Sequence, residues 1–410
     1  MPDPSSPPAP AFKPLAGVRV IDLTKVLAGP LCTQYLADLG AHVIKVEACD
    51  GGDDTRSWPP QAGSDGAVFL SANRNKHSLA LDLKQEAGHR VIERLLETAD
   101  VVVDSFRTGA MERLGLGREV LRKLNPRLIH ASISGFGRSG PLADLPGYDL
   151  ALQAYSGMMS ITGEKDGGPV RSPFSPLDQT TGIWAAFGVL AALRERDATG
   201  QGKYLEVSLF ETALAFLGYH AQSYWIDGKE PERFGSGHPG LCPYQAFAAA
   251  DGHILITIGN DALWERFCKA CGLEHGIDDP RFRSNRDRVA NYQETVALVS
   301  DCIASNSVAH WSQILTAAGV PNSPVHTIPQ VLDMAHTAAR GMVMSYQHPQ
   351  HGAQKSIAMP VQFEDGKREV GLPPPMLGQH SAAILAELGY GGEEIERLQR
   401  QGVVRCGPDR

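Results

Sequence analysis

The residues Val18-Arg-Val-Ile-Asp-Leu23 form a short apolar run that predicts a buried β-strand, and His42-Val-Ile-Lys-Val-Glu47 predicts the next one. Between them, residues 30–39 have the length and composition of a helix. Strand, helix and strand in this order predict a parallel sheet covered by helices. The same alternation continues to residue 132, and it indicates a Rossmann-like α/β half.

Further elements follow outward from these two strands. We expect strands at residues 78–83, 101–103, 128–132 and 204–209, and helices at 86–97, 178–196 and 211–225. Sheets of this kind bind ligands beyond the carboxyl ends of their strands. We therefore expect the loops after those ends to share one rim: Val26 to Gly29, Glu47 to Arg56, Lys84, and Ser105 to Arg107.

The length of the chain predicts more than one domain. Its 410 residues exceed the ~250 to 300 at which a single hydrophobic core stops growing. We assign residues 1–14, which are rich in proline, to a disordered tail rather than a secretory signal. Residues 15–225 with 335–410 form the large Rossmann-like domain, and residues 226–334 form a smaller α+β domain.

Composition excludes several classes of function. Apolar residues make up 42% of the chain, and its longest apolar run, residues 183–193, is too short to span a membrane. The net charge is −8 and no dense basic run occurs, so neither a membrane nor a nucleic acid is an expected partner. Seven cysteines, an odd number in a chain long enough to build its own core, predict free thiols and a cytoplasmic location.

Three motifs have a functional and a structural interpretation. Cys268 and Cys271 form a single CxxC, which favours a buried helix because a zinc site needs a second pair. Residues 135–140 match GxGxxG, but Pro141 follows at once where a dinucleotide site needs a helix, so a glycine-rich turn is favoured. His348 and His351 stand in a Gly/Pro-rich stretch that predicts a surface loop rather than a metal site.

Asp178 is the most interesting acidic residue. At the head of a long helix it can act as an N-cap that accepts backbone amides. The same amides and the helix dipole would keep the carboxylate ionised and able to attack a carbonyl. Gly182, one turn later, would leave room for a ligand. Spacing alone does not choose between the cap and the nucleophile.

Several segments resemble one known family. They are Val20-Ile-Asp-Leu-Thr-Lys-Val-Leu-Ala-Gly-Pro30, Leu39-Gly-Ala-His-Val-Ile-Lys-Val-Glu47, Asn73-Arg-Asn-Lys76, Ser78-Leu-Ala-Leu-Asp-Leu83, Ile133-Ser-Gly-Phe-Gly137, Leu177-Asp-Gln-Thr-Thr-Gly182 and Pro374-Pro-Met-Leu-Gly-Gln-His380. In this order they resemble the class III CoA-transferases, which include formyl-CoA and carnitine CoA-transferases and the α-methylacyl-CoA racemases. The resemblance runs from about Leu15 to Val404, and it implies the fold of that family and an interlocked homodimer.

The resemblance also implies roles for individual residues. Asp178 stands at the position of the nucleophilic aspartate of the family. The positions that match CoA contacts are Leu27, Ala28, Lys84, Ser105, Phe106, Arg107, Arg113, Gly147, Tyr148 and Asp149. The positions that match a mobile loop over the active site are Gly235, Gly237, His238 and Gly240. No metal site is implied.

Two departures from the family pattern narrow the function. Leu27 and Ala48 replace the Gln and Arg of formyl-CoA transferases, which makes formate and oxalate poor candidates as substrates. Tyr148 replaces the His of the His-Asp pair in the racemases, so a transferase is favoured over a racemase. The run Pro243-Tyr-Gln-Ala-Phe247 resembles the succinyl-CoA:glutarate (hydroxymethylglutarate) branch.

The resemblance implies a reaction that needs no permanently bound cofactor, with coenzyme A as substrate and product. Its partners are an acyl-CoA and a carboxylic acid, and exchange of one thioester for another is close to thermoneutral. Three alternatives remain open: a racemase of the same fold, an NAD-linked oxidoreductase that would use residues 135–140, and a catalytically inactive CoA-binding protein.

Overall fold

The computed structural model describes residues 13–364 and 366–407, so most of the predicted tail, residues 1–12, lies outside the described residues. The chain divides into two compact units. The first contains residues up to 156, 172–219 and 335–410, and the second contains residues 157–171 and 220–334.

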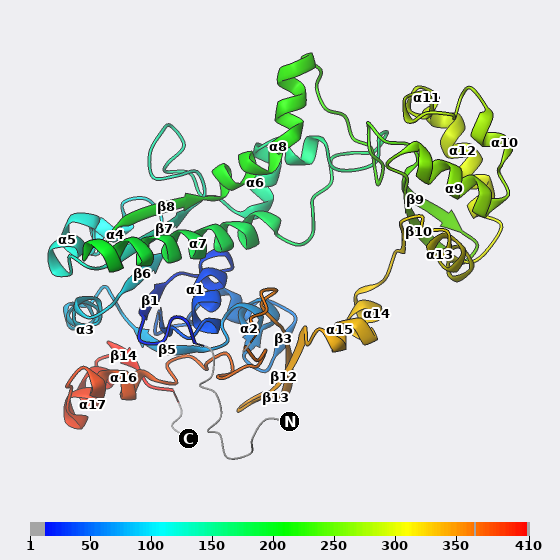
Figure 1. Cartoon of the computed structure of the whole chain (residues 1–410). Coiled ribbons are helices and arrows are strands. Elements are labelled where there is room, and N and C mark those ends of the chain that lie inside the picture. Colours follow the sequence, from blue (N-terminus) through cyan, green and yellow to red (C-terminus); the bar gives the residue numbers. More distant parts are fainter. Residues whose placement is uncertain (1–12, 365, 408–410) are drawn as a thin grey trace. The chain divides into compact units, whose positions relative to one another are not determined.

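The first unit contains the elements of a Rossmann-like fold (Figure 1). Up to residue 134 they are β1 (Arg19–Leu23), α1 (Ala28–Asp38), β2 (His42–Glu47), η1 (Asp54–Ser57), β3 (Gln61–Ala62), β4 (Asp65–Gly66), α2 (Ala67–Ala72), β5 (Lys76–Leu81), α3 (Glu86–Glu97), β6 (Val101–Asp104), α4 (Ala110–Arg113), α5 (Arg118–Leu124) and β7 (Ile129–Ser134). The rest are α6 (Asp149–Tyr155), α7 (Pro176–Thr199), β8 (Tyr204–Ser208), α15 (Ala335–Ala339), β12 (Val343–His348), β13 (Gly352–Ile357), α16 (Ser381–Glu387), α17 (Gly392–Arg400) and β14 (Val404–Arg405).

In the described part of the chain, the main sheet has seven strands in the order β14-β5-β2-β1-β6-β7-β8. All neighbours are parallel except β14, which pairs antiparallel with β5. The six parallel strands follow the order of a dinucleotide-binding fold, in which the direction of winding reverses between the first and fourth strands. Here that switch point lies between β1 and β6, and this confirms the predicted α/β class.

Burial explains why these runs form strands. Val20, Ile21, Ile44 and Val102 are fully buried, because a parallel sheet has helices on both faces. On one face, the side chains of the sheet form a core with α3, α5, α16 and α17. α1 and α7 pack side by side and contact the sheet. The predicted strands and helices are present with end shifts of a few residues. The short elements α2, α4, α5 and α6 and the β12–β13 hairpin were not predicted.

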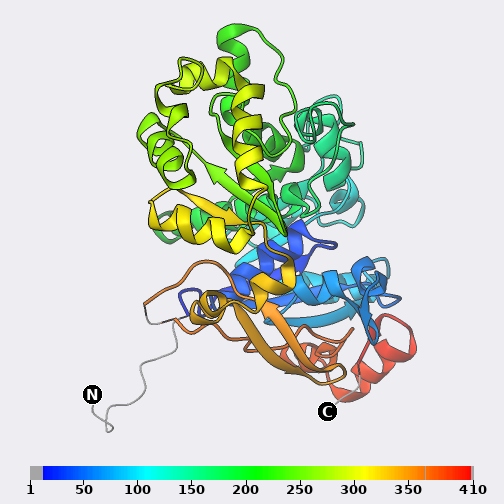
Figure 2. The same cartoon turned by 90° about the vertical axis from the view of Figure 1, so that its right-hand side faces the viewer.

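A β-hairpin from the C-terminal part of the chain belongs to the same unit. β12 and β13 are antiparallel and are drawn in orange in Figure 2. The hairpin is tied to the earlier part of the chain by Arg74, whose Nη1 donates to Ser356 Oγ at 2.9 Å. Segments almost 300 residues apart in sequence therefore stabilise one unit.

The second unit has its own core. Its elements are η2 (Met158–Ser160), β9 (Tyr244–Ala249), β10 (Gly252–Thr257), α9 (Asp261–Cys271), α10 (His275–Asp278), α11 (Asn285–Ala290), α12 (Tyr292–Ile303), α13 (Val308–Ala317), β11 (Asn322–Pro324) and α14 (Ile328–Leu332). The strands form an antiparallel sheet in the order β11-β10-β9. Trp264, Phe267 and Cys268 are buried in its core, which confirms the buried-helix interpretation of the CxxC motif.

α8 (Leu209–Asp227) begins in the first unit and ends in the second. Its backbone leaves the helical conformation at Gly218, where φ is 40° and ψ is −117°. Within residues 13–364 and 366–407, no helix combines the length and apolar character that a bilayer span requires.

Candidate active site

A pocket of about 210 Å³ lies at the switch point of the sheet. Its walls come from the turn after β1, the loop after β6, the end of β7 and the loop before α6. Asp178, near the start of α7, also lines it. The pocket therefore occupies the place where open α/β sheets bind ligands.

Asp178 is not the N-cap of its helix. α7 begins at Pro176, so Asp178 is the third helical residue, and the N-cap is Ser175, which has a left-handed backbone (φ 48°). The side chain of Ser175 makes no capping hydrogen bond. The N-cap interpretation is therefore wrong, because Pro176 starts the helix two residues earlier than the acidic residue suggested.

The carboxylate of Asp149 takes the place of the missing cap. Asp149 Oδ2 accepts the backbone N–H of Leu177 at 2.8 Å and that of Asp178 at 3.1 Å. The other oxygen, Oδ1, accepts a hydrogen bond from Gln153 Nε2. Gln153 is buried and also binds both backbone groups of Ser172, at 2.9 and 3.2 Å. Asp149 thus holds the start of α7, a role that the resemblance, which placed Asp149 among the CoA contacts, did not indicate.

The environment raises the pKa of Asp178 to about 7 from the ordinary aspartate value of 3.8. Burial is the main cause, since it disfavours the charged form, and the negative charge of Asp149 adds to it. The expectation that amides would keep Asp178 ionised is wrong, because the first amides of α7 bind Asp149 instead. Folding therefore favours the protonated form, and this contribution to stability is lost as pH rises from 3.8 through about 7.

Gly182 brings α7 against the first turn of α1. A Cβ at this position would lie 2.6 Å from the carbonyl oxygen of Ala28. The space beside Gly182 is therefore filled by backbone, not by a ligand as the sequence suggested. Its consequence is that Asp178, one turn earlier, faces the same pocket as Leu27 and Ala28.

The structure brings most of the predicted site residues together. The pocket is lined by Leu27, Ala28, Ser105, Phe106, Arg107, Gly147, Tyr148 and Asp178. Asp149 is buried beneath it. Lys84 and Arg113 are exposed and do not line the pocket, although the position of a Cβ on Gly109 is 3.1 Å from Arg113 Nη1.

The GxGxxG segment forms a turn in the wall of this pocket. Gly137 and Gly140 have φ of 94° and 86°, and the next helix, α6, begins only at Asp149. This geometry confirms the glycine-rich turn. Gly135 and Gly147 touch each other, since a Cβ on Gly147 would lie 2.4 Å from Gly135 Cα.

Arg138 is a site residue that the sequence did not reveal. Its Nη1 donates to the Phe106 carbonyl at 2.6 Å, and its Nη2 donates to Asp104 Oδ1 at 3.2 Å and to the Ile133 carbonyl at 2.9 Å. It therefore ties the loop after β6 to the end of β7. The sequence around Arg138 matches no motif that predicts a binding role, so its partners become apparent only in the folded structure.

The predicted mobile loop belongs to the second unit. Gly235 N donates to the Gly163 carbonyl at 2.8 Å, and Gly235 has a left-handed φ of 59°. A Cβ on Gly237 would lie 2.6 Å from Tyr292 Oη. Gly240 N donates to His238 Nδ1 at 3.0 Å. Arg233 anchors the segment just before this loop by donating to the carbonyls of Ser160, Glu164 and Gly167.

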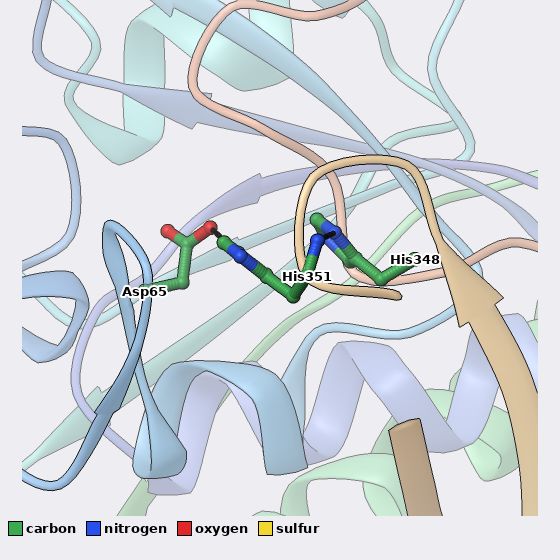
Figure 3. A group of neighbouring side chains, drawn as sticks. All are labelled: Asp65, His348 and His351. Carbon is green, nitrogen blue, oxygen red and sulfur yellow. Dashed lines mark hydrogen bonds and ion pairs between the residues drawn. The ribbon is translucent and has the colours of Figure 1, made fainter. Parts of the chain in front are cut away.

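The prediction of a surface loop at His348 and His351 is wrong. His348 ends β12 and is buried, and the side chain of His351 is only 1% exposed, because the turn after β12 packs on Asp65 (Figure 3). His351 Nε2 lies 2.9 Å from Asp65 Oδ2. His348 uses both ring nitrogens, since Nδ1 accepts two backbone N–H groups and Nε2 lies 3.0 Å from the Pro374 carbonyl. The cluster therefore serves to fasten the hairpin.

Comparison with known proteins agrees with this geometry. A family model described as CoA-transferase family III matches residues 15–381. The chain belongs to this family. The resemblance to class III CoA-transferases is thereby confirmed, and the chain is an enzyme that acts as a CoA-transferase in acyl-CoA metabolism.

Two relatives and one solved structure show how far the similarity to CoA-transferase family III extends. Succinyl-CoA:glutarate CoA-transferase of Mus musculus is 40% identical over 396 residues, 96% of this chain and 91% of the relative. Acetyl-CoA:oxalate CoA-transferase of Acetobacter aceti is 41% identical over 338 residues, 82% of this chain and 87% of the relative. The crystal structure of a CAIB/BAIF family protein from Brucella suis has a TM-score of 0.83 at 36% identity and covers 92% of this chain and 99% of that one.

The pKa of Asp178 predicts the pH dependence of this CoA-transferase. If Asp178 must be ionised to react, log kcat/KM rises with pH and levels off above about 7. Asn in place of Asp149 removes the negative charge that adds to burial in raising this pKa, so D149N should move the midpoint to lower pH. Glu119→Gln, an exposed carboxylate on α5, serves as the control and should leave the profile unchanged. A wild-type profile that is flat from about pH 5 to 9 would contradict this role.

Proposed function

We propose that this enzyme transfers CoA between carboxylic acids with the Asp178 carboxylate as the nucleophile. The observation that carries the proposal is the position of this carboxylate, in a pocket shared with the Leu27–Ala28 turn and the Ser105–Arg107 loop. In the part of the chain that the structure describes, no hydrogen bond holds the Asp178 carboxylate, which leaves its oxygens available to a substrate.

The reaction proceeds by acyl exchange at Asp178. A carboxylate oxygen attacks the thioester carbonyl of the donor, the C–S bond breaks, and CoA leaves as a thiolate. The thiolate then attacks the aspartyl carbonyl of the mixed anhydride, which releases the donor acid and leaves an aspartyl-CoA thioester. The acceptor carboxylate attacks this thioester and expels CoA thiolate, and the thiolate attacks the acyl carbonyl of the new anhydride. The product is the new acyl-CoA, and Asp178 is free again.

The elevated pKa of Asp178 and the burial that causes it both favour the proposed reaction. Near pH 7 about half of the enzyme carries the ionised nucleophile, because the pKa is about 7. A carboxylate that is poorly stabilised by its surroundings is more nucleophilic than a solvated one, and burial removes the water that would compete with the acceptor.

We assign the CoA-binding role to the pocket residues Leu27, Ala28, Ser105, Phe106, Arg107, Gly147 and Tyr148, and the resemblance extends it to Lys84 and Arg113. Arg107 is exposed at the mouth of the pocket, where a guanidinium can bind a phosphate of the nucleotide. Tyr148 supplies a phenol where the racemases have an imidazole, and this difference supports transfer over racemisation.

We propose succinyl-CoA as the donor and a dicarboxylic acid as the acceptor. The mouse relative, named as a succinyl-CoA:glutarate CoA-transferase, supports this pairing. The relative from Acetobacter aceti acts on oxalate by its name and keeps the acceptor open to shorter diacids. A screen of succinyl-CoA against a panel of dicarboxylates, with acyl-CoA products identified by mass, distinguishes these acids.

Three further proposals complete the function. The loop of Gly235, Gly237, His238 and Gly240 acts as a lid that keeps water from the aspartyl intermediates.

A second copy of the chain covers α7, on which Trp184 and Phe187 are 47% and 62% exposed, and this supports a homodimer. In the described part of the chain, no disulfide joins Cys32, Cys49, Cys242, Cys268, Cys271 or Cys302, which supports the cytoplasmic location.

Replacement of Asp178 tests the nucleophile. Asp178→Asn should lower kcat by at least about 1,000-fold, because an amide does not attack a thioester. CoA binding, measured by calorimetry, should stay close to wild type, since the amide has the same shape and the carboxylate caps nothing. Thermal stability near neutral pH should equal or exceed that of wild type, because the amide removes a buried charge. A variant that retains near-wild-type turnover would rule out the mechanism, and one that fails to fold would give Asp178 a structural role instead.

Replacement of Arg107 tests the phosphate contact. Arg107→Ala should raise KM for the acyl-CoA about tenfold at low salt, and by less at high salt because ions screen the interaction. Arg122→Ala is the matched control, because Arg122 is an exposed arginine on α5 that pairs with Glu119. Arg113→Ala, measured beside them, tests whether the nucleotide extends past the pocket. Equal KM values for Arg107→Ala and Arg122→Ala would remove Arg107 from the site.

A further inference from the structure

The turn that leads into α1 has an unusual backbone. Val26 has a φ of 72°, in the left-handed region. A β-branched side chain disfavours this region strongly, so the conformation persists only where surrounding contacts impose it. Val26 lines the pocket together with Leu27 and Ala28, which immediately follow it. Contacts from neighbouring segments therefore hold this turn.

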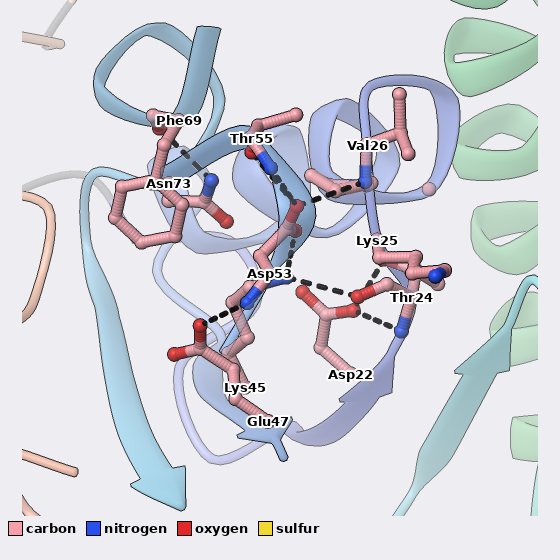
Figure 4. Close-up of polar contacts among 12 residues, drawn as sticks. Asp22, Thr24, Lys25, Val26, Lys45, Glu47, Asp53, Thr55, Phe69 and Asn73 are labelled. Atoms are coloured by element: carbon pink, nitrogen blue, oxygen red, sulfur yellow. Dashed lines mark hydrogen bonds and ion pairs between the residues drawn. The ribbon is translucent and has the colours of Figure 1, made fainter. Parts of the chain in front are cut away.

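A buried carboxylate from the loop after β2 binds the strained residue. Asp53 Oδ1 accepts the backbone N–H of Val26 at 3.2 Å (Figure 4). The same oxygen accepts the N–H of Thr55 at 3.0 Å and its hydroxyl at 2.7 Å, which fixes the orientation of the carboxylate. Asp53 is 3% exposed, so water does not compete for these bonds.

Lys45 connects Asp53 to Thr24, two residues before Val26. Its ammonium lies 2.9 Å from Asp53 Oδ2 and donates to the Thr24 carbonyl at 2.9 Å. Burial alone would lower the pKa of Lys45, but Asp53 and Asp22 outweigh it and raise the pKa, so the side chain stays charged. Lys45 therefore holds both Thr24 and the carboxylate that binds Val26.

Ser105 holds the turn from the opposite side. Its hydroxyl accepts the backbone N–H of Lys25 at 3.1 Å. The loop after β6 and the loop after β2 thus each bind one amide of the turn, Lys25 from one side and Val26 from the other. The resemblance assigned Ser105 to CoA contact, and the geometry gives it this additional task.

We propose that Asp53, held by Lys45, is a positioning residue that imposes the left-handed conformation of Val26 and so presents the Leu27–Ala28 turn to CoA. The inference rests on the proposed function of this pocket. Asp53 does not line the pocket and acts only through the backbone of the turn. The strain at Val26 makes the claim testable, because glycine adopts the same φ without strain.

The test combines Asp53→Ala with Val26→Gly in the full-length enzyme. Calorimetry with CoA alone gives Kd, and initial rates with succinyl-CoA and a dicarboxylate give KM and kcat. Asp53→Ala should raise Kd and KM about tenfold, because the turn relaxes from its strained conformation. Val26→Gly in the Asp53→Ala background should bring both constants back to within about threefold of wild type, because glycine needs no external restraint at this φ.

Asp38→Asn is the matched control. Asp38 forms a comparably buried pair with Arg74, at 2.6 Å, but it lies outside the pocket. This variant should lose stability without a change in Kd. If Asp53→Ala does not fold, Asp53→Asn retains an acceptor oxygen and should show a smaller rise in Kd that Val26→Gly reverses.

The outcomes separate this inference from the function on which it rests. A folded Asp53→Ala variant with wild-type Kd and KM would overturn the positioning role. So would an increase in Kd that Val26→Gly fails to reverse, or an equal increase in Asp38→Asn. Failure of the wild-type enzyme to bind CoA would instead overturn the proposed pocket.

Discussion

The site depends on how the start of α7 is capped. Helix N-termini carry amides without partners inside the helix, and one of these amides usually binds the side chain of the N-cap residue, most often Ser, Thr, Asp or Asn. Here they bind Asp149 from a different helix. The carboxylate of Asp178 therefore lines the pocket without capping the helix, and the charge of Asp149 helps to keep its pKa near neutral. The hydrogen bonds between the start of α6 and the start of α7 thus distinguish the acid that caps the helix from the acid that lines the pocket.

The remaining parts of the site follow from the strand order. The switch point between β1 and β6 places the turn before α1 beside the loop after β6, and both contribute walls to the pocket. Two ion pairs, one fully buried and one partly buried, then fix these walls. Arg138 with Asp104 ties the loop after β6 to the end of β7, and Asp53 with Lys45 holds the turn after β1. A buried charge is costly unless it is paired, so loss of one partner of the Asp53–Lys45 pair should disturb the turn that it holds.

The sequence predicts the order of the strands and helices well, but it predicts the contacts of individual side chains poorly. Apolar runs such as Val18 to Leu23 and His42 to Glu47 are strong signals, because burial on both faces demands them. The segments around Asp178 predict it as the nucleophile through their resemblance to the family. Its helix position and pKa were predicted incorrectly, because both depend on Pro176 and on Asp149, which lies 29 residues away. The burial of His348 and His351 was missed for a similar reason, since Asp65 and Pro374 come from distant parts of the chain.

The most direct test of the account is the mass of the peptide that contains Asp178 after brief incubation with succinyl-CoA and rapid acid quench. The mechanism predicts a covalent adduct on Asp178 with the mass of CoA less one water, which disappears when a dicarboxylate acceptor is added before the quench. The Asp178→Asn enzyme should show none. Transfer that proceeds without any such adduct, or an adduct on a different residue, would contradict the assignment of Asp178 as the group that carries CoA.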